Sequence, residues 1–176
     1  MRQQPGSKQK MKQMIFTLVG QDKPGLIDSV AQAVFDMGGN WLASNFSHMA
    51  GHFTGFVQIE LPQQKHLDLV DKFSQHPDLQ IHLVEGLDTD NSDTITAQVE
   101  VMGNDKPGIV QELTAILNQF NINIIKFESS CESAPNWGSS MFKAKARISV
   151  APEFDMDPLR EALEGIANDL MVDIEL

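Results

Sequence analysis

Apolar residues follow two different spacings along this chain. The run MIFTLV at 14–19 is short and rich in β-branched residues, which predicts a strand. After it, five apolar residues have the spacing of one helix face: Leu26, Val30, Ala33, Val34 and Met37. The first half then continues with two strands, a second helix and a final strand, which we predict at 40–49, 57–61, 65–75 and 79–85.

The second half of the chain repeats this order. GQDKPGLIDSV at 20–30 returns 83 positions further on as GNDKPGIVQEL at 103–113, and the same shift places apolar residues on apolar residues through the following helix. A strand at 94–102 precedes the repeated turn. Beyond the helix, two strands, a helix and a last strand are predicted at 122–130, 142–150, 157–169 and 171–176.

The resulting order, β-α-β-β-α-β, occurs twice and is that of the ferredoxin-like unit. We therefore predict an α+β fold of two ferredoxin-like domains in tandem, each a four-stranded antiparallel sheet with two helices on one face. The predicted organisation is a disordered basic tail, a first domain, a polar linker and a second domain, at 1–13, 14–85, 86–94 and 95–176.

Charge limits the possible partners. The formal net charge is −11, although the tail holds four cations (Arg2, Lys8, Lys10 and Lys12) and no acid, so the body is more acidic still. Such a body repels a phosphate backbone, and we expect no direct binding to nucleic acid. The basic row Lys143, Lys145 and Arg147 faces away from the helices; it is either solvated or a contact for another sheet.

Several classes of site lack support in the sequence. No apolar run is long enough to cross a membrane and the tail lacks a signal-peptide core, so we expect a cytoplasmic protein. The single cysteine, Cys131, is expected to be a free thiol. His48 and His52 could face each other across a turn, but no third metal ligand is evident. We expect no catalytic residue, metal or cofactor.

The repeated turn is the best candidate site for a small ligand. A helix start offers unpaired N–H groups to a carboxylate, glycine permits close approach, and aspartate accepts an ammonium group. The candidate ligand-binding residues are Gly20, Gln21, Asp22, Gly25, Leu26 and Asn40 in one copy and Gly103, Asn104, Asp105, Gly108, Ile109 and Asn123 in the other. The alternative is that the glycines and aspartates only build the turn.

The motif Gly-x-Asp-x-Pro-Gly, at 20–25 and 103–108, resembles the turn of ACT domains, small-molecule-sensing modules named from enzymes of amino-acid metabolism. The resemblance covers about 14–176. A pair of such domains with little else is similar to the family of glycine cleavage system transcriptional repressors. That resemblance implies a regulator without a DNA-binding domain, which represses the glycine cleavage operon by binding its LysR-type activator, with glycine as the relieving ligand and a homo-oligomer as a possible form.

ACT domains also imply two alternatives. The first is a regulatory subunit of an amino-acid biosynthetic enzyme, which the sequence does not separate from a transcription regulator. The second is an enzyme, because an ACT domain precedes the catalytic domain of formyltetrahydrofolate deformylases. Here a second copy of the motif occupies the place of that catalytic domain, so we expect a protein that is not an enzyme.

Overall fold

The computed structural model describes residues 10–87, 94–133 and 140–176. The chain divides into two compact units, Met1–Thr89 and Asp90–Leu176, called here the first and second unit. Most of the expected tail (1–9), most of the expected linker (88–93) and the hairpin loop at 134–139 lie outside the described residues.

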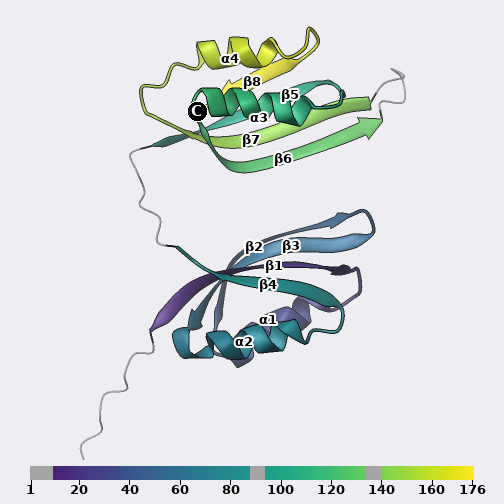
Figure 1. The fold of residues 1–176 in the computed structure, drawn as a ribbon, viewed down its shortest axis with the longest axis vertical. Coiled ribbons are helices and arrows are strands. Elements are labelled where there is room, and N and C mark those ends of the chain that lie inside the picture. The colour runs from purple at the N-terminus through teal and green to yellow at the C-terminus, as the bar shows by residue number, and fades with distance from the viewer. Residues whose placement is uncertain (1–9, 88–93, 134–139) are drawn as a thin grey trace, which may run out of the picture. The chain divides into compact units, whose positions relative to one another are not determined.

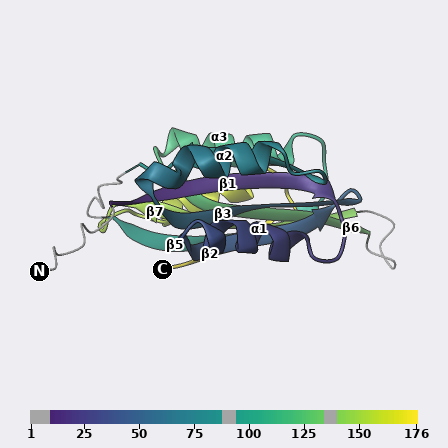
Figure 2. The ribbon, with the colours of Figure 1, turned by 90° about the horizontal axis from the view of Figure 1, so that it is seen from below.

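The first unit follows the predicted order of elements (Figure 1). It comprises β1 (Met11–Gln21), α1 (Leu26–Asp36), β2 (Asn40–Met49), β3 (His52–Pro62), a short 3₁₀ turn (Gln63–Lys65), α2 (His66–Ser74) and β4 (Leu79–Glu85). Helices α1 and α2 lie side by side over the same face of the sheet, as both views show (Figures 1 and 2).

The second unit repeats the arrangement. It comprises β5 (Ile95–Asn104), α3 (Ile109–Gln119), β6 (Asn123–Ser133), β7 (Ser140–Val150), α4 (Asp157–Glu164) and β8 (Met171–Glu175). The strand orders are β2-β3-β1-β4 and β6-β7-β5-β8, and every pairing is antiparallel. The predicted fold class, two four-stranded antiparallel sheets each with two helices on one face, is confirmed.

Each unit has its own apolar core between its sheet and its helices. In the first unit, alternate residues of β1 (Met14, Phe16 and Leu18) pack with the helix residues Leu26, Val30 and Val34. The second core is built in the same way from Val99, Val101, Ile109, Leu113 and Leu117. No polar or charged side chain among the described residues is buried, so burial of apolar surface is what drives both units to fold.

Several element boundaries differ from the predictions, and two of the differences have a clear physical reason. Strand β1 begins at Met11, inside the expected tail, because Met11 and Lys12 pair with the end of β3. Helix α4 ends at Glu164 rather than near residue 169. Gly165 ends the helix, yet Ile166 and Ala167 still pack against the core, so the helical spacing of apolar residues continues past the helix end.

Candidate functional site

The two motif turns leave helix N–H groups without a helical partner. In the first unit the earliest hydrogen bond of α1 runs from the Ser29 N–H to the Gly25 carbonyl (3.0 Å), and no side chain caps the helix. In the second unit the Glu112 N–H donates to the Gly108 carbonyl (3.0 Å), again without a side-chain cap. Of the N–H groups that precede these bonds, that of Ile109 donates to the Lys106 carbonyl (3.3 Å), while the others have no helical partner and carry the partial positive charge of the helix start.

Gly25 and Gly108 are glycines for a conformational reason. Their φ angles are +86° and +87°, a left-handed region that other residues adopt at a cost. A Cβ built on either glycine would meet no atom within 4 Å, so the space beside each helix start is open. Both glycines therefore allow a ligand to approach the backbone closely.

A hollow adjoins each of these turns. The first cleft, about 320 Å³, is lined by Asp22, Lys23, Gly25, Leu26, Ile27, Asp28 and Phe53. The second cleft, about 660 Å³, is lined by Asp105, Lys106, Gly108, Ile109, Val110, Gln111, Thr114, Ser129, Ser130, Cys131 and Phe142. The second cleft thus extends from the start of α3 to the edge strand β6.

Six of the twelve predicted ligand-binding residues line these clefts: Asp22, Gly25 and Leu26 in one, and Asp105, Gly108 and Ile109 in the other. Gly20 and Gly103 lie outside the clefts and have a packing role. A Cβ on Gly20 would lie 2.3 Å from the Asp78 carbonyl oxygen, and one on Gly103 would lie 2.9 Å from Leu170. These two glycines let the strand pass close to the segment before β4 or β8.

Gln21 and Asn104 also lie outside the clefts. Gln21 is exposed at the end of β1, opposite His52. The Asn104 N–H donates to the Asp169 carboxylate (2.9 Å). This backbone hydrogen bond is the main reason why the pKa of Asp169 lies below its ordinary value. Asn104 therefore ties the end of β5 to the loop before β8.

The expectation that Asn40 and Asn123 reach the motif turn of their own copy is wrong. Asn40 pairs with Glu60, at the end of the sheet where β1 begins, whereas Gly20 pairs with Phe53 at the other end. Asn123 lies opposite Ser149, far along β7 from the partner of Gly103. An eleven-residue helix separates each asparagine from the turn, and such a helix spans about 16 Å.

The sequence reasoning missed the strand residues that line the second cleft. Ser129 and Cys131 alternate with outward-facing residues of β6 and share the helix side of the sheet with Phe127. Phe142, on β7, lies opposite Cys131 and Gly103 and is almost fully buried. These positions can be found only from the strand register, because they lie more than twenty residues from the motif.

The Asp105 carboxylate acts on the Cys131 thiol across the second cleft. Cys131 is exposed, but desolvation by its neighbours raises the pKa of the thiol, and the charge and hydrogen bonding of the Asp105 carboxylate raise it further. The raised pKa means that the folded protein favours the neutral thiol. Cys131 is the only cysteine in the chain, so its reactivity reports on this cleft alone.

We expect Asp105→Asn to speed the reaction of Cys131 with Ellman's reagent severalfold near neutral pH. Removing the negative charge lowers the pKa of the thiol, so the variant has more thiolate below that pKa. At alkaline pH the thiol is ionised in both proteins, so the reaction rates of the variant and of the unmodified protein converge. A pH profile of the reaction rate checks this. Asp22→Asn makes the same change in the first unit and should leave the rate unchanged; equal profiles for all three proteins would contradict the coupling.

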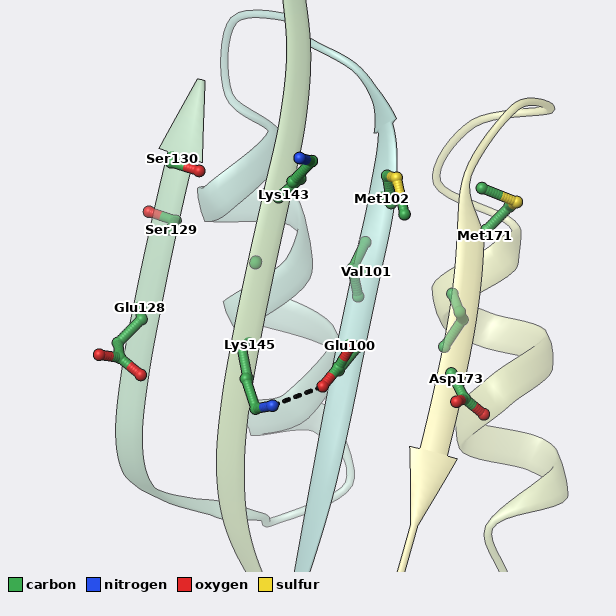
Figure 3. Close-up of a pocket in the computed structure, with 12 residues that line it drawn as sticks. Glu100, Val101, Met102, Glu128, Ser129, Ser130, Lys143, Lys145, Met171 and Asp173 are labelled. Atoms are coloured by element: carbon green, nitrogen blue, oxygen red, sulfur yellow. Dashed lines mark ion pairs between the residues drawn. The ribbon is translucent and has the colours of Figure 1, made fainter. Parts of the chain in front are cut away.

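A third hollow, about 620 Å³, lies on the open face of the second sheet, with the helices behind it (Figure 3). One cross-strand row through it contains Glu128, Lys145, Glu100 and Asp173. Lys145 forms an ion pair with Glu100 (2.6 Å), and this hydrogen bond is the largest cause of its raised pKa. Lys143 pairs with Glu132 (3.0 Å). The two lysines of the predicted basic row are therefore paired with acids.

The strand register also settles the histidine pair. His48 lies opposite Phe53, while Met49 lies opposite His52, so the two imidazoles are on opposite faces of the hairpin. Among residues 10–87, 94–133 and 140–176, no three His, Cys, Asp or Glu side chains gather as metal ligands. None of the described helices has both the length and the apolar character that a membrane crossing requires.

Comparison with known proteins gives a family and many structural neighbours, among them two that align over nearly the whole chain with a TM-score above 0.5. The model of the ACT domain matches residues 12–83 and 96–131. A crystal structure of an unknown protein from Galdieria sulphuraria has a TM-score of 0.79 and 23% identity, over 94% of this chain and 98% of that one. A "putative glycine cleavage system transcriptional repressor" has a TM-score of 0.60 and 19% identity, over the same shares of each chain. At these identities the likeness shows the fold. No curated protein sequence matches the chain.

Proposed function

The chain belongs to the ACT domain family, since the family model matches more than half of it in two segments, and from this premise we propose that it is a regulatory protein that responds to a small amino acid. In this proposal it represses the glycine cleavage operon by binding the LysR-type activator rather than DNA, and glycine relieves the repression. The protein acts by binding and is not an enzyme. The similar fold of the named repressor supports this direction.

The observation that carries the proposal is the pairing of an open cleft with an uncapped helix start. The first-turn N–H groups and the helix dipole suit a carboxylate, while Asp22 or Asp105 suits an ammonium group at the same turn. A free amino acid carries both groups on neighbouring atoms. The turn therefore has groups that suit the carboxylate and the ammonium group of any α-amino acid, and it need not contact the side chain of the ligand.

We expect glycine to bind weakly and to raise the melting temperature. Because a ligand gains at most about 1.5 kcal/mol per non-hydrogen atom, a molecule as small as glycine is limited to a micromolar Kd or weaker. Titration calorimetry and thermal unfolding at millimolar glycine measure this. Absence of both heat and stabilisation, with glycine and with L-serine, would contradict direct sensing.

Two matched variants test the role assigned to the aspartates. Asp22→Asn and Asp105→Asn each keep the shape of the side chain and remove the charge that would pair with the ammonium group. Loss of a charge-assisted hydrogen bond costs about 1.5–3 kcal/mol, so the affinity should fall by about tenfold to a hundredfold in a copy that binds. Unchanged affinity in both variants would mean that the aspartates only build the turn.

The partner is tested with the purified LysR-type activator of the glycine cleavage operon from the same organism. Analytical ultracentrifugation should show a complex that weakens when glycine is added. The net negative charge of the chain repels a phosphate backbone and so fits contact with the activator rather than with DNA. If the activator does not bind and a purified amino-acid biosynthetic enzyme does, the protein is a regulatory subunit instead.

A further inference from the structure

The two clefts differ although their motifs are nearly identical. The first is about 320 Å³ and the second about 660 Å³. Their walls can be compared position by position because the strand registers match. Phe46 of β2 lies opposite Gly55, and Ser129 of β6 lies opposite Ala144, each pair at the same register distance from the first glycine of its motif.

An aromatic side chain fills the space in the first unit that is open in the second. The Phe46 ring stacks on Phe53, with centroids 5.2 Å apart and planes at 23°. Gly55 makes room for it, because a Cβ there would lie 2.5 Å from the Phe46 ring. At the matching place in the second unit, Ser129 is small and lines the cleft, whose floor includes Phe142. The larger second cleft thus coincides with a small residue, Ser129, at the position that Phe46 occupies in the first unit.

The charges beside the two helix starts differ as well. Asp28 lines the first cleft, and Gln111 takes its place in the second. Among the described residues, neither Asp22 nor Asp28 has an ion-pair partner, because Lys23 pairs with Asp78 instead. Asp28, which corresponds to the neutral Gln111, opposes a ligand carboxylate at the start of α1, whereas Asp22 corresponds to Asp105 in the second unit.

In the second unit the corresponding charges are neutral or paired. Gln111 carries no charge, and Glu112 is held by Lys106, whose ammonium group lies 2.6 Å from the carboxylate and also donates to the Ile166 carbonyl (3.0 Å). Asp105 is the carboxylate that remains to receive an ammonium group. The volume of the cleft and the charges beside it therefore both favour ligand binding at the turn of the second unit.

We propose that the chain binds its amino acid in the second cleft alone, and that the side chain at the Phe46 or Ser129 position decides which copy is open. The inference rests on the proposed function and names its site. The ligands are small α-amino acids whose side chain fits beside Ser129, with L-serine as the representative and glycine as the smallest member. Residue 129 is then a specificity-determining residue, and Phe46 narrows the first cleft.

The test uses L-serine and glycine as probes on the full chain. Titration calorimetry should give one equivalent per chain, and L-serine should slow the reaction of Cys131 with Ellman's reagent. Ser129→Phe should weaken L-serine binding by at least about tenfold and remove the protection of Cys131. Ser133→Phe, the same substitution at an exposed position of β6 outside the clefts, should change neither. Phe46→Ser combined with Asp28→Asn should add a second equivalent.

The outcomes separate this inference from the proposed function. Two equal equivalents in the unmodified protein, or unchanged L-serine affinity in Ser129→Phe, would overturn the single site and leave amino-acid sensing in place. Binding of neither amino acid to the unmodified protein would overturn the proposed function itself. Thermal unfolding verifies that each variant is folded. If the Phe46 variant does not fold, the stoichiometry of the unmodified protein and the affinity of Ser129→Phe still test whether the second cleft is the single site.

Discussion

Replacing Phe16 by alanine is expected to lower the free energy of unfolding of the first unit by about 3–5 kcal/mol. The Phe16 side chain is fully buried and meets two rings edge to face, Phe73 at 4.9 Å and Trp41 at 6.0 Å between centroids. Alanine would leave a cavity between the sheet and α2, and it would also remove these ring contacts. Urea denaturation followed by Trp41 fluorescence, in a Trp137→Phe background, measures the loss.

Phe56 provides the matched control. It lies on the opposite face of the same sheet and is 52% exposed, so Phe56→Ala should cost less than about 1 kcal/mol. A loss for Phe56→Ala as large as that for Phe16→Ala would show that burial does not distinguish the two phenylalanines. Such a loss would mean that apolar side chains also pack on the face of the first sheet that carries Phe56.

Replacing Gly20 by alanine is expected to cost about 3 kcal/mol, whereas the same change at Gly103 should cost about 1 kcal/mol. The added Cβ on Gly20 would lie 2.3 Å from a backbone oxygen, that of Asp78, which cannot move without shifting the loop before β4. On Gly103 the nearest atom is a methyl group of Leu170, at 2.9 Å, which a change of rotamer can withdraw, and the nearest backbone atom, the Asp169 carbonyl oxygen, is at 3.2 Å and needs only a small shift.

Both variants are measured by chemical denaturation with circular dichroism, alongside the unmodified protein. The two glycines hold the same place in the same motif, so any difference arises from their neighbours. Equal losses would mean that the backbone conformation, rather than the close contact, sets the cost. That result would return Gly20 and Gly103 to a purely local role in the turn.

The order of elements could be predicted because the same pattern of apolar and polar residues occurs in both halves of the sequence. A helix spacing that begins at Leu26 recurs at Ile109, and the alternation at 142–150 matches β7. The end of α4 could not be predicted from spacing, since Ile166 remains apolar and packed after the backbone has left the helix. Periodicity reports which residues face the core, and it does not report where the hydrogen-bonded helix stops.

Part of the candidate site followed from the motif, whereas the strand residues that line it depend on register. Asp105, Gly108 and Ile109 adjoin the second cleft because a helix start fixes its own first residues in space. Ser129 and Cys131 reach the same cleft through an antiparallel pairing that contains a bulge between Ile124 and Lys126. A bulge changes which residues face the helices, so neither serine nor cysteine could be assigned to this side from local sequence.

The separate apolar cores of the two units bear on how such a chain can diversify. A substitution that loosens packing in one core leaves the contacts of the other intact, as the two sets of buried residues share no member. After a duplication, one copy can therefore acquire changes such as a bulky aromatic side chain beside its cleft without disturbing the core of the other copy. We therefore expect the two units of such a chain to diverge in function.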